Sequence, residues 1–431
     1  MGYRVDFINR KIVATGGIYV RSYPLANQII IDSKIEGKPG MFLNAFFVQN
    51  LLPKNHNVLV KKNGYFDYQK NIPVIENQVT KLENILLIKQ NISFNLLSGR
   101  INYFSVSPDG KNILIAGPGT KSIGFEYFSL SNQNQKKSYS LPVQNAEVVD
   151  IKWSDNSGVA LIKIQKYSDI SYYIFDSSKT IQQTTPLAYL DKNSQQISFN
   201  SRDLTQLFYV ENKILYLLKQ NKPAVVIKNL ITYKISGNNI LWLSSDGFLQ
   251  QSDISGKLIQ KITQNKIAVN PLENYEIIDS FGKTFIKKNN ALLILDNESK
   301  NFKNFDAPID NYNLLFSPDG KNMIYFNNSE IYLYSFSETS EKKNVKLFSA
   351  NSPEIISNCF WVNNDYIIFE SGNKIIISEI DYRGNINAVE VSQNYEKSTD
   401  SKNPKIYYNG HDAKIYILSG SSLYSSEKIT P

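Results

Sequence analysis

The stretch FSVSPDGKNILIA occupies residues 104–116, and LLFSPDGKNMIYF occupies residues 314–326. Each copy places the turn sequence Ser-Pro-Asp-Gly between two apolar segments. Proline suits the first corner of a type I turn, aspartate accepts a local backbone hydrogen bond, and glycine tolerates the exit geometry. Each copy therefore predicts a β-hairpin, and its recurrence indicates a repeated structural unit.

Weaker copies of this hairpin pattern recur between and beyond the two stretches. Their equivalent apolar anchors are Phe104, Trp153, Phe199, Ile235, Ile277, Phe316, Trp361 and Tyr407. The anchors lie about 43 residues apart on average, which is the period of propeller blades. A second pair of short strands follows most hairpins, so each unit predicts a four-stranded sheet. Because one such sheet leaves both apolar faces open, we expect eight sheets, with seven as the alternative, to pack around a closed ring.

The chain before the repeats lacks this period and predicts a separate small β domain. We interpret residues 1–15 as a linker, residues 16–80 as the β domain and residues 81–431 as the propeller. The segment LENILLIK at 82–89 is expected to supply an outer strand to the last blade. The predicted fold is therefore all-β, a small N-terminal β-sandwich followed by a β-propeller of four-stranded blades.

The repeats and the N-terminal domain each resemble a known family. The FSPDGK turn followed by apolar residues resembles the WD40-like repeats of TolB-type propellers over residues 85–431, although the Trp-Asp ending of true WD40 blades is missing. Residues 16–80 resemble the PEGA domain, a small β-sandwich of bacterial and archaeal envelope proteins, although Lys54 stands where that family usually has glycine. The matching positions are Gly17, Ile18, Val20, Ser22, Pro24, Ala26, Ile29, Ile31, Asp32, Leu52, Pro53, His56, Val58, Val60, Gly64 and Tyr65.

The resemblance to PEGA-propeller proteins implies a place outside the cell membrane. Such chains are typically tethered by one N-terminal membrane helix, with the globular part outside the cell. Residues 1–17 look like the stretch that would follow that helix, so we expect an anchor upstream of Met1. The sequence itself contains no run of about 18 apolar residues and no signal peptide.

The net charge of +8 arises mainly from lysine, because only six of the 47 basic residues are arginine. Residues 1–80 contain ten basic and five acidic side chains, and this excess of positive charge favours binding to an anionic surface. A spread, arginine-poor excess is not typical of nucleic-acid binding, so no nucleic-acid partner is expected. Cys359 is the only cysteine, which excludes an internal disulfide and a multi-cysteine metal site.

Few residues point to chemistry. His56 and His411 are expected in turns or on the surface, without a catalytic or metal-binding role. Three arginines, Arg100, Arg202 and Arg383, lie in or beside the propeller, which is too few for the cluster of a sialidase-type site. No nucleophile elbow, zinc-protease motif, phosphate loop or acidic calcium loop occurs.

Acidic residues of the hairpin turns leave one route to an enzyme open. Asp109, Asp155, Asp246 and Asp319 are interpreted as turn-forming residues, as is Asp412 of the sequence Gly-His-Asp. Two of them on one face of a propeller could alternatively act as acid and base on a glycan or peptide.

The sequence therefore favours a non-catalytic, membrane-tethered envelope protein. Its propeller is expected to bind protein or cell-wall polysaccharide, with the small β domain as a spacer. A glycan- or peptide-acting enzyme and a component of an envelope assembly machine are the alternatives. We assign no catalytic residue, cofactor or metal ligand, and the ligand-binding residues are unknown from the sequence.

Overall fold

The computed structural model describes residues 2–6, 10–40, 44–118, 121–131, 136–307, 310, 312–337, 343–391 and 405–430. All forty secondary-structure elements within these residues are β-strands, which confirms the all-β prediction. The described part of the chain contains no helix long and apolar enough to cross a membrane. The chain divides into two compact units. Unit 1 combines Met1–Leu97 with Asn313–Pro431, and unit 2 is Ser98–Tyr312.

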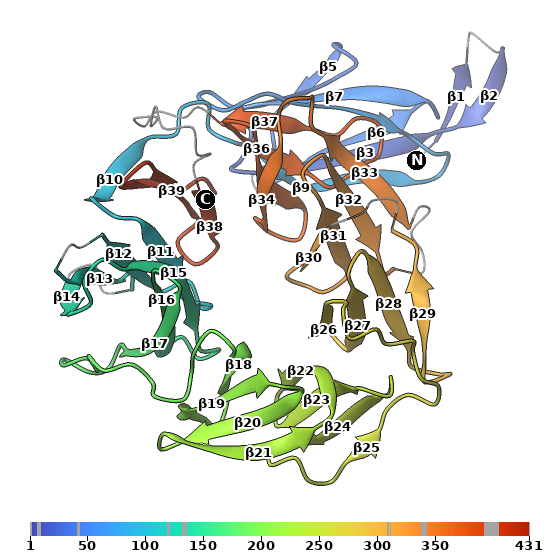
Figure 1. The fold of residues 1–431 in the computed structure, drawn as a ribbon. Helices are drawn as coiled ribbons and strands as arrows, with labels where there is room; N and C mark the ends of the chain where they lie inside the picture. Colours follow the sequence, from blue (N-terminus) through green and yellow to red (C-terminus); the bar gives the residue numbers. More distant parts are fainter. Residues whose placement is uncertain are drawn as a thin grey trace. The chain divides into compact units, whose positions relative to one another are not determined.

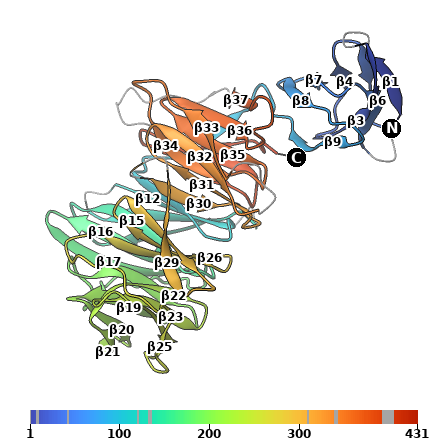
Figure 2. The same ribbon diagram turned by 90° about the vertical axis from the view of Figure 1, so that its right-hand side faces the viewer.

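Unit 1 begins with an N-terminal module of three sheets. Its strands are β1 (Tyr3–Asp6), β2 (Lys11–Ala14), β3 (Gly16–Tyr23), β4 (Gln28–Ile31), β5 (Ile35–Gly37), β6 (Phe46–Leu51), β7 (Asn55–Lys61), β8 (Tyr68–Pro73) and β9 (Val79–Leu86). Strands β1 and β2 form a hairpin, the order β6-β3-β9 forms a second sheet, and the order β5-β4-β7-β8 forms a third. Figure 2 shows these strands grouped together, with β8 and β9 nearest to the sheet of β36 and β37.

The second and third sheets of the module share one apolar core. Side chains alternate along a strand, and β8 shows this as a strict alternation of buried and exposed residues. Ile18 and Val20 of β3 meet Ile29 and Ile31 of β4 in the core, and all four are fully buried. Burial of apolar area from both sheets therefore holds the module together.

Strand β9 belongs to this module and not to the propeller. It runs parallel to β3, with Gly17 beside Val79 and Tyr23 beside Leu86. The prediction that residues 82–89 add an outer strand to the last blade is therefore wrong, because Leu82 and Ile85 are buried in the module core. Strand β10 (Phe94–Gly99) instead pairs with β40 of the last sheet.

Unit 1 also contains three four-stranded sheets from the C-terminal part of the chain. Their strands are β30 (Asn313–Phe316), β31 (Asn322–Phe326), β32 (Glu330–Ser335) and β33 (Asn344–Ser349), then β34 (Ile356–Trp361), β35 (Tyr366–Ser371), β36 (Lys374–Glu379) and β37 (Ala388–Val391), and finally β38 (Lys405–Asn409), β39 (Lys414–Ser419) and β40 (Ser422–Ser426) with β10. The first two sheets follow chain order, and the last has the order β10-β40-β39-β38.

Unit 2 contains five sheets in chain order. Their strands are β11 (Tyr103–Val106), β12 (Asn112–Gly117), β13 (Ile123–Ser129) and β14 (Lys136–Leu141); β15 (Glu147–Trp153), β16 (Val159–Lys166) and β17 (Asp169–Asp176); β18 (Gln195–Asn200), β19 (Asp203–Glu211), β20 (Ile214–Lys219) and β21 (Lys222–Lys228); β22 (Leu230–Ser236), β23 (Asn239–Ser244), β24 (Leu249–Asp253) and β25 (Gln260–Lys261); and β26 (Tyr275–Ser280), β27 (Lys283–Lys288), β28 (Ala291–Asp296) and β29 (Asn301–Phe305). The strands β22 to β25 lie side by side in Figure 1. The sheet of β15 to β17 has three described strands instead of the expected four.

Consecutive sheets bury their apolar faces against each other within each unit. One cluster joins the sheet of β11 to β14 with that of β15 to β17, where Tyr139 of β14 stacks on Phe175 of β17 at 5.3 Å between ring centroids. Equivalent clusters join each following pair of sheets in unit 2, and two more do so in unit 1. Antiparallel four-stranded sheets stacked face to face are the blades of a β-propeller.

The Ser-Pro-Asp-Gly turns explain why the quoted sequence recurs. In both copies the serine carbonyl accepts a hydrogen bond from the glycine N–H, as a type I turn requires. The turns also reach the following sheet, because Asp109 N–H donates to Ser157 Oγ and Asp319 N–H donates to Asn364 Oδ1. The motif therefore stabilises both its own hairpin and the contact with the next blade.

Replacing Ser317 by alanine should lower the free energy of unfolding by about 1–2 kcal/mol. Ser317 is fully buried, and its hydroxyl donates to Asp319 Oδ1 at 2.7 Å and accepts from Asn322 N–H at 3.0 Å. Chemical denaturation would measure the loss. Ser299→Ala is the matched control, because Ser299 donates to Asp296 in an exposed turn and should change stability by less than about 0.5 kcal/mol.

The same serine should affect the pH dependence of stability. Burial raises the pKa of Asp319, but the hydrogen bonds from Ser317 and from Lys321 N–H lower it by more. The pKa of Asp319 therefore lies below its usual value of 3.8. A carboxyl whose pKa is lowered by folding adds stability above its unfolded pKa and loses it as the pH falls through the folded pKa. Loss of stability below about pH 4 should therefore be shallower in Ser317→Ala. Parallel acid-unfolding curves for the variant and the wild type would contradict this assignment.

Candidate functional site

Three of the four turn aspartates hold turns, as predicted. Asp109 Oδ1 accepts from Ser107 Oγ at 2.6 Å, Asp319 Oδ1 accepts from Ser317 Oγ at 2.7 Å, and Asp246 Oδ1 accepts from Ser244 Oγ. Such bonds to the charged form keep the pKa of Asp109 low, although burial opposes them. These carboxylates are therefore bound by their own turns.

Asp155 differs from the other three. In its turn Ser154 Oγ donates to Asn156 Oδ1 at 2.9 Å, so the asparagine takes the acceptor position. Asp155 lies inside the turn that the Ser157 N–H closes on the Ser154 carbonyl, as predicted, but it stands one position earlier, where the quoted copies have proline. Asp155 also lines a cavity on the first strands of unit 2.

The two histidines have different places. His56 lies on β7 and is 3% exposed, so the prediction of a turn or surface position is wrong. Its ring nitrogens contact Asp32 Oδ2 at 2.6 Å and the Leu52 carbonyl at 2.8 Å, which fixes a loop of the module. His411 is exposed in a turn, as predicted. Neighbouring Asp412 accepts from Tyr416 OH at 2.6 Å.

A buried ion pair joins the module to the sheet of β34 to β37. Lys70 on β8 is fully buried, and its Nζ donates to Glu379 Oε1 at 2.5 Å, to the Asp381 carbonyl at 2.7 Å and to the Asn385 carbonyl at 2.8 Å. Glu379 Oε2 accepts from Tyr68 OH at 2.9 Å. Every ammonium proton of Lys70 is therefore used by the chain itself.

The backbone of β8 strengthens this junction. Asn385 donates to the Gln69 carbonyl at 2.8 Å and accepts from Asn71 N–H at 2.9 Å, while Asn387 Oδ1 accepts from Gln69 N–H at 3.2 Å. Gly384 lies so close to β8 that an added Cβ would meet Asn71 O at 1.8 Å. The loop of residues 380–387 is therefore shaped to receive the edge of the module.

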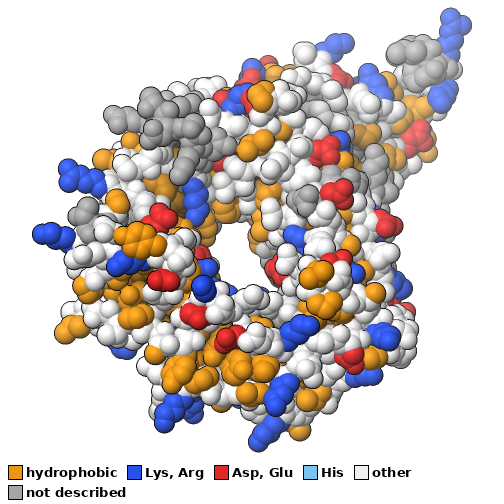
Figure 3. Space-filling model, in the orientation of Figure 1, with side chains coloured by type: hydrophobic (Ala, Val, Ile, Leu, Met, Phe, Trp, Pro, Cys, Tyr) orange, Lys and Arg blue, Asp and Glu red, His pale blue; other side chains and the backbone are white. Residues whose placement is uncertain are grey.

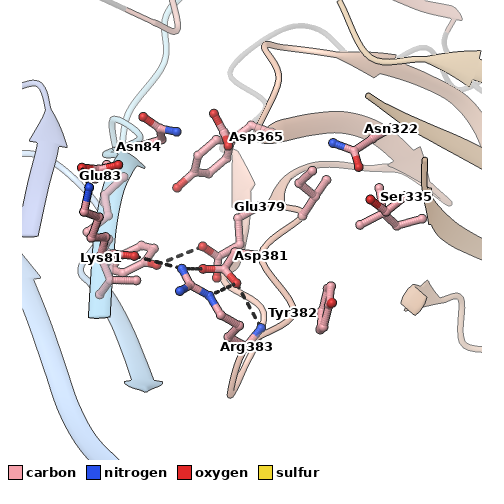
Figure 4. A pocket seen from close by; sticks show the side chains of 16 residues that line it. Lys81, Glu83, Asn84, Asn322, Ser335, Asp365, Glu379, Asp381, Tyr382 and Arg383 are labelled. Carbon is pink, nitrogen blue, oxygen red and sulfur yellow. Dashed lines mark hydrogen bonds and ion pairs between the residues drawn. The ribbon is translucent and has the colours of Figure 1, made fainter. Parts of the chain in front are cut away.

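A cavity of about 330 Å³ opens beside this junction (Figure 4). Arg383 spans it, donating to both carboxylate oxygens of Asp381 and, at 3.0 Å, to the Lys81 carbonyl. Burial raises the pKa of Asp381, but Arg383 and Lys70 reverse this effect and hold the pKa below its usual value. Burial raises the pKa of Asp365, whose other neighbours include Asn84 and the carboxylates of Asp319 and Asp381. The described charges of this cavity mainly connect the module to the blade.

A second cavity, of about 430 Å³, lies within unit 2 on the first strands of four successive sheets. The lining residues are Lys152, Trp153, Ser154 and Asp155 from β15 and its turn, Gln196, Ser198 and Phe199 from β18, Thr232, Tyr233, Lys234 and Ile235 from β22, and Tyr275, Glu276 and Ile277 from β26. Because side chains alternate along a strand, the residue before each anchor faces away from the blade core. This rule places Lys152, Ser198, Lys234 and Glu276 on one wall, which we call the inner wall.

The inner wall is held by a hydrogen-bond network across two sheets. A register shift between Gln195 and Ser198 in β18 directs Gln196 toward β22, where its Oε1 accepts from Thr232 Oγ1 at 3.1 Å. Tyr233 OH donates to the Gln196 carbonyl at 2.6 Å, so Ser198 Oγ is the donor in its 2.7 Å contact with Tyr233 OH. These bonds fix the shape of the cavity, and they involve neither Lys152 nor Lys234.

The two lysines of the inner wall repel each other. Partial enclosure by protein lowers the pKa of Lys152, nearby Lys234 lowers it further, and Asp150 and Asp155 oppose both effects. Lys152 Nζ donates a hydrogen bond to the backbone carbonyl of Ile197. The cavity lining thus combines ammonium, carboxylate, hydroxyl and amide groups with aromatic rings. No group of three or more potential metal ligands occurs among the described residues.

Comparisons with known proteins concern the fold. No protein-family model matches the chain, and no curated protein matches it. Similar solved structures include the Dos1 propeller, at 10% identity and a TM-score of 0.49, covering 80% of this chain and 96% of that chain. The Cps50 (Swd1) β-propeller domain of Myceliophteria thermophila has 10% identity and a TM-score of 0.45, covering 79% of this chain and 99% of that chain. Dihydro-heme d1 dehydrogenase NirN in complex with DHE has 10% identity and a TM-score of 0.47, covering 69% of this chain and 67% of that chain.

The sheet topology itself defines the class. Stacked antiparallel four-stranded sheets that follow one another along the chain make this an all-β protein with a β-propeller.

Proposed function

We propose that the chain is a non-catalytic envelope protein whose propeller binds protein or cell-wall glycan. It would lie outside the membrane, tethered by an N-terminal anchor, with eight blades of the TolB type and a PEGA-like sandwich as the N-terminal module. Two features support this architecture. Within the described residues, successive antiparallel sheets follow the order of the predicted repeats, and two of the three sheets of the module share one core.

The observation that carries the proposal is the inner wall. Lys152 and Lys234 face one cavity together with hydroxyl, amide and aromatic groups, whereas Glu379, Asp381 and Arg383 of the junction cavity form ion pairs within the chain. The concave wall is built by the first strands of four successive sheets, and it offers several contact points for an extended polymer.

An enzyme is the second candidate, because Asp155 and Glu276 line the same cavity. Most glycoside hydrolases use a carboxylic acid and a carboxylate that flank the glycosidic bond. The proposed binding function and this alternative predict different fates for a bound glycan.

Co-sedimentation with purified peptidoglycan sacculi tests the proposal. We expect the wild type to bind, and the double variant Lys152→Ala/Lys234→Ala to bind about tenfold more weakly, which corresponds to about 1.4 kcal/mol. Lys222→Ala/Lys257→Ala removes two exposed lysines elsewhere in unit 2 and should bind normally. New reducing ends that disappear in Asp155→Asn or Glu276→Gln would favour the enzyme. Equal binding by both double variants would exclude the inner wall as the glycan site.

A further inference from the structure

The β1–β2 hairpin exposes an apolar face that no described part of the chain covers. Tyr3, Val5 and Ile12 are 78%, 48% and 71% exposed. Val5 pairs with Ile12 across the hairpin, and Tyr3 lies two residues before Val5 on the same strand. The three side chains therefore share one face of the hairpin.

The hairpin is anchored firmly at its base. Thr15 is fully buried, its hydroxyl donates to the Gly2 carbonyl at 2.6 Å, and Gly2 N–H donates back to that hydroxyl at 2.9 Å. Val13 is 6% exposed and belongs to the buried side of the hairpin. Thr15 Oγ1 also lies 3.3 Å from Asn50 Oδ1, and Asn77 N–H donates to the Thr15 carbonyl at 3.1 Å, so the module holds the base of the hairpin.

Basic residues lie at the tip and on the opposite face of the hairpin, because Arg4 pairs with Val13 and Lys11 pairs with Asp6. Arg4 and Lys11 lie on the two strands, and Arg10 is exposed in the turn that precedes β2. Figure 3, in the orientation of Figure 1, shows Lys and Arg side chains at the end of this hairpin. The first 80 residues carry ten of the basic side chains and five acidic ones. Long basic side chains can reach lipid phosphates while apolar neighbours enter the boundary of the bilayer.

The hairpin also points away from the junction with the blades. The module contacts the loop of residues 380–387 through β8, whereas β1 lies on the opposite side of the module in Figure 2. A two-stranded hairpin alone is marginally stable in water, so a surface that covers its apolar face would stabilise it.

We propose that the β1–β2 hairpin binds the surface of an anionic lipid bilayer. Tyr3, Val5 and Ile12 enter the headgroup boundary, and Arg4, Arg10 and Lys11 contact lipid phosphates. This contact rests on the location at the membrane in the proposed function. It would be a second contact with the membrane, separate from the proposed N-terminal anchor.

Vesicle flotation of the purified chain tests this contact. Vesicles that contain phosphatidylglycerol should bind the protein, and vesicles of phosphatidylcholine alone should bind it much more weakly. Val5→Ser/Ile12→Ser should reduce binding to the anionic vesicles about tenfold, as expected for two partly buried aliphatic side chains. Arg10→Gln/Lys11→Gln should weaken binding to the anionic vesicles. It should also make this binding less dependent on salt concentration.

The matched control is Ile181→Ser/Leu272→Ser, which removes two exposed apolar side chains of unit 2 that are 86% and 94% exposed. It should bind vesicles like the wild type. Equal binding of both apolar double variants, or no binding to anionic vesicles, would overturn the proposal. Dimers that vanish in Val5→Ser/Ile12→Ser without vesicle binding would assign the face to a second copy. Binding to sacculi tests the inner wall separately, so a failure to bind vesicles would not count against the proposed function.

Discussion

Replacing Lys70 by alanine should lower the free energy of unfolding of unit 1 by about 3–5 kcal/mol. The Lys70 side chain is fully buried and that of Glu379 is 4% exposed, so the variant leaves a carboxylate without its counter-charge. It also removes the donor to the carbonyls of Asp381 and Asn385. Denaturant unfolding would measure the loss of stability. Limited proteolysis would measure the loss of docking of the module.

Lys61→Ala provides the matched control for this prediction. Lys61 and Asp67 form an ion pair in the same module, but their side chains are 40% and 49% exposed. Solvent screening limits such a pair to about 0–1 kcal/mol. The double variant Lys70→Met/Glu379→Leu should recover much of the stability, because it removes both buried charges. If Lys70→Ala costs no more than Lys61→Ala, the buried pair does not hold the module.

Gly384→Ala should destabilise the same junction by about 3 kcal/mol. Gly384 has φ +69°, a conformation that alanine adopts only with strain, and its added Cβ would meet Asn71 O at 1.8 Å. The loop must then move away from β8, which breaks the hydrogen bonds of Asn385 with Gln69 and Asn71. Faster amide exchange at Asn71 would report the loss of docking directly.

Gly282→Ala separates the two causes of this effect. Gly282 has a nearly equal φ of +70°, but an added Cβ would meet no atom within 4 Å. It should therefore cost only the backbone strain, about 1–2 kcal/mol, in unit 2. Equal losses in the two glycine variants would show that the contact with Asn71 contributes nothing.

The repeat and its turns could be predicted from the sequence because they depend on local rules. Alternation along a strand fixes which side chains are buried, and Ser-Pro-Asp-Gly encodes the turn geometry. The inner wall could also have been found in this way, because Lys152 and Lys234 each precede a predicted anchor. The shift that turns Gln196 toward β22 has no such signal, because it depends on the pairing of neighbouring strands.

The junction could not be predicted because its partners are distant in sequence. Lys70 and Glu379 are 309 residues apart, and an exposed lysine would have the same local pattern. The strand β9 was misplaced for a similar reason, since an apolar strand fits a module sheet and a blade equally well. His56 was misplaced because its burial depends on Asp32, which lies 24 residues away.

The central claim is that ligands bind the inner wall while the junction serves to hold the module. Hydrogen–deuterium exchange with and without solubilised peptidoglycan fragments tests this claim most directly. We predict slower exchange in β15, β18 and β22 on addition of the fragments, and no change in residues 380–387. Protection at residues 380–387 without protection of these three strands would contradict the claim.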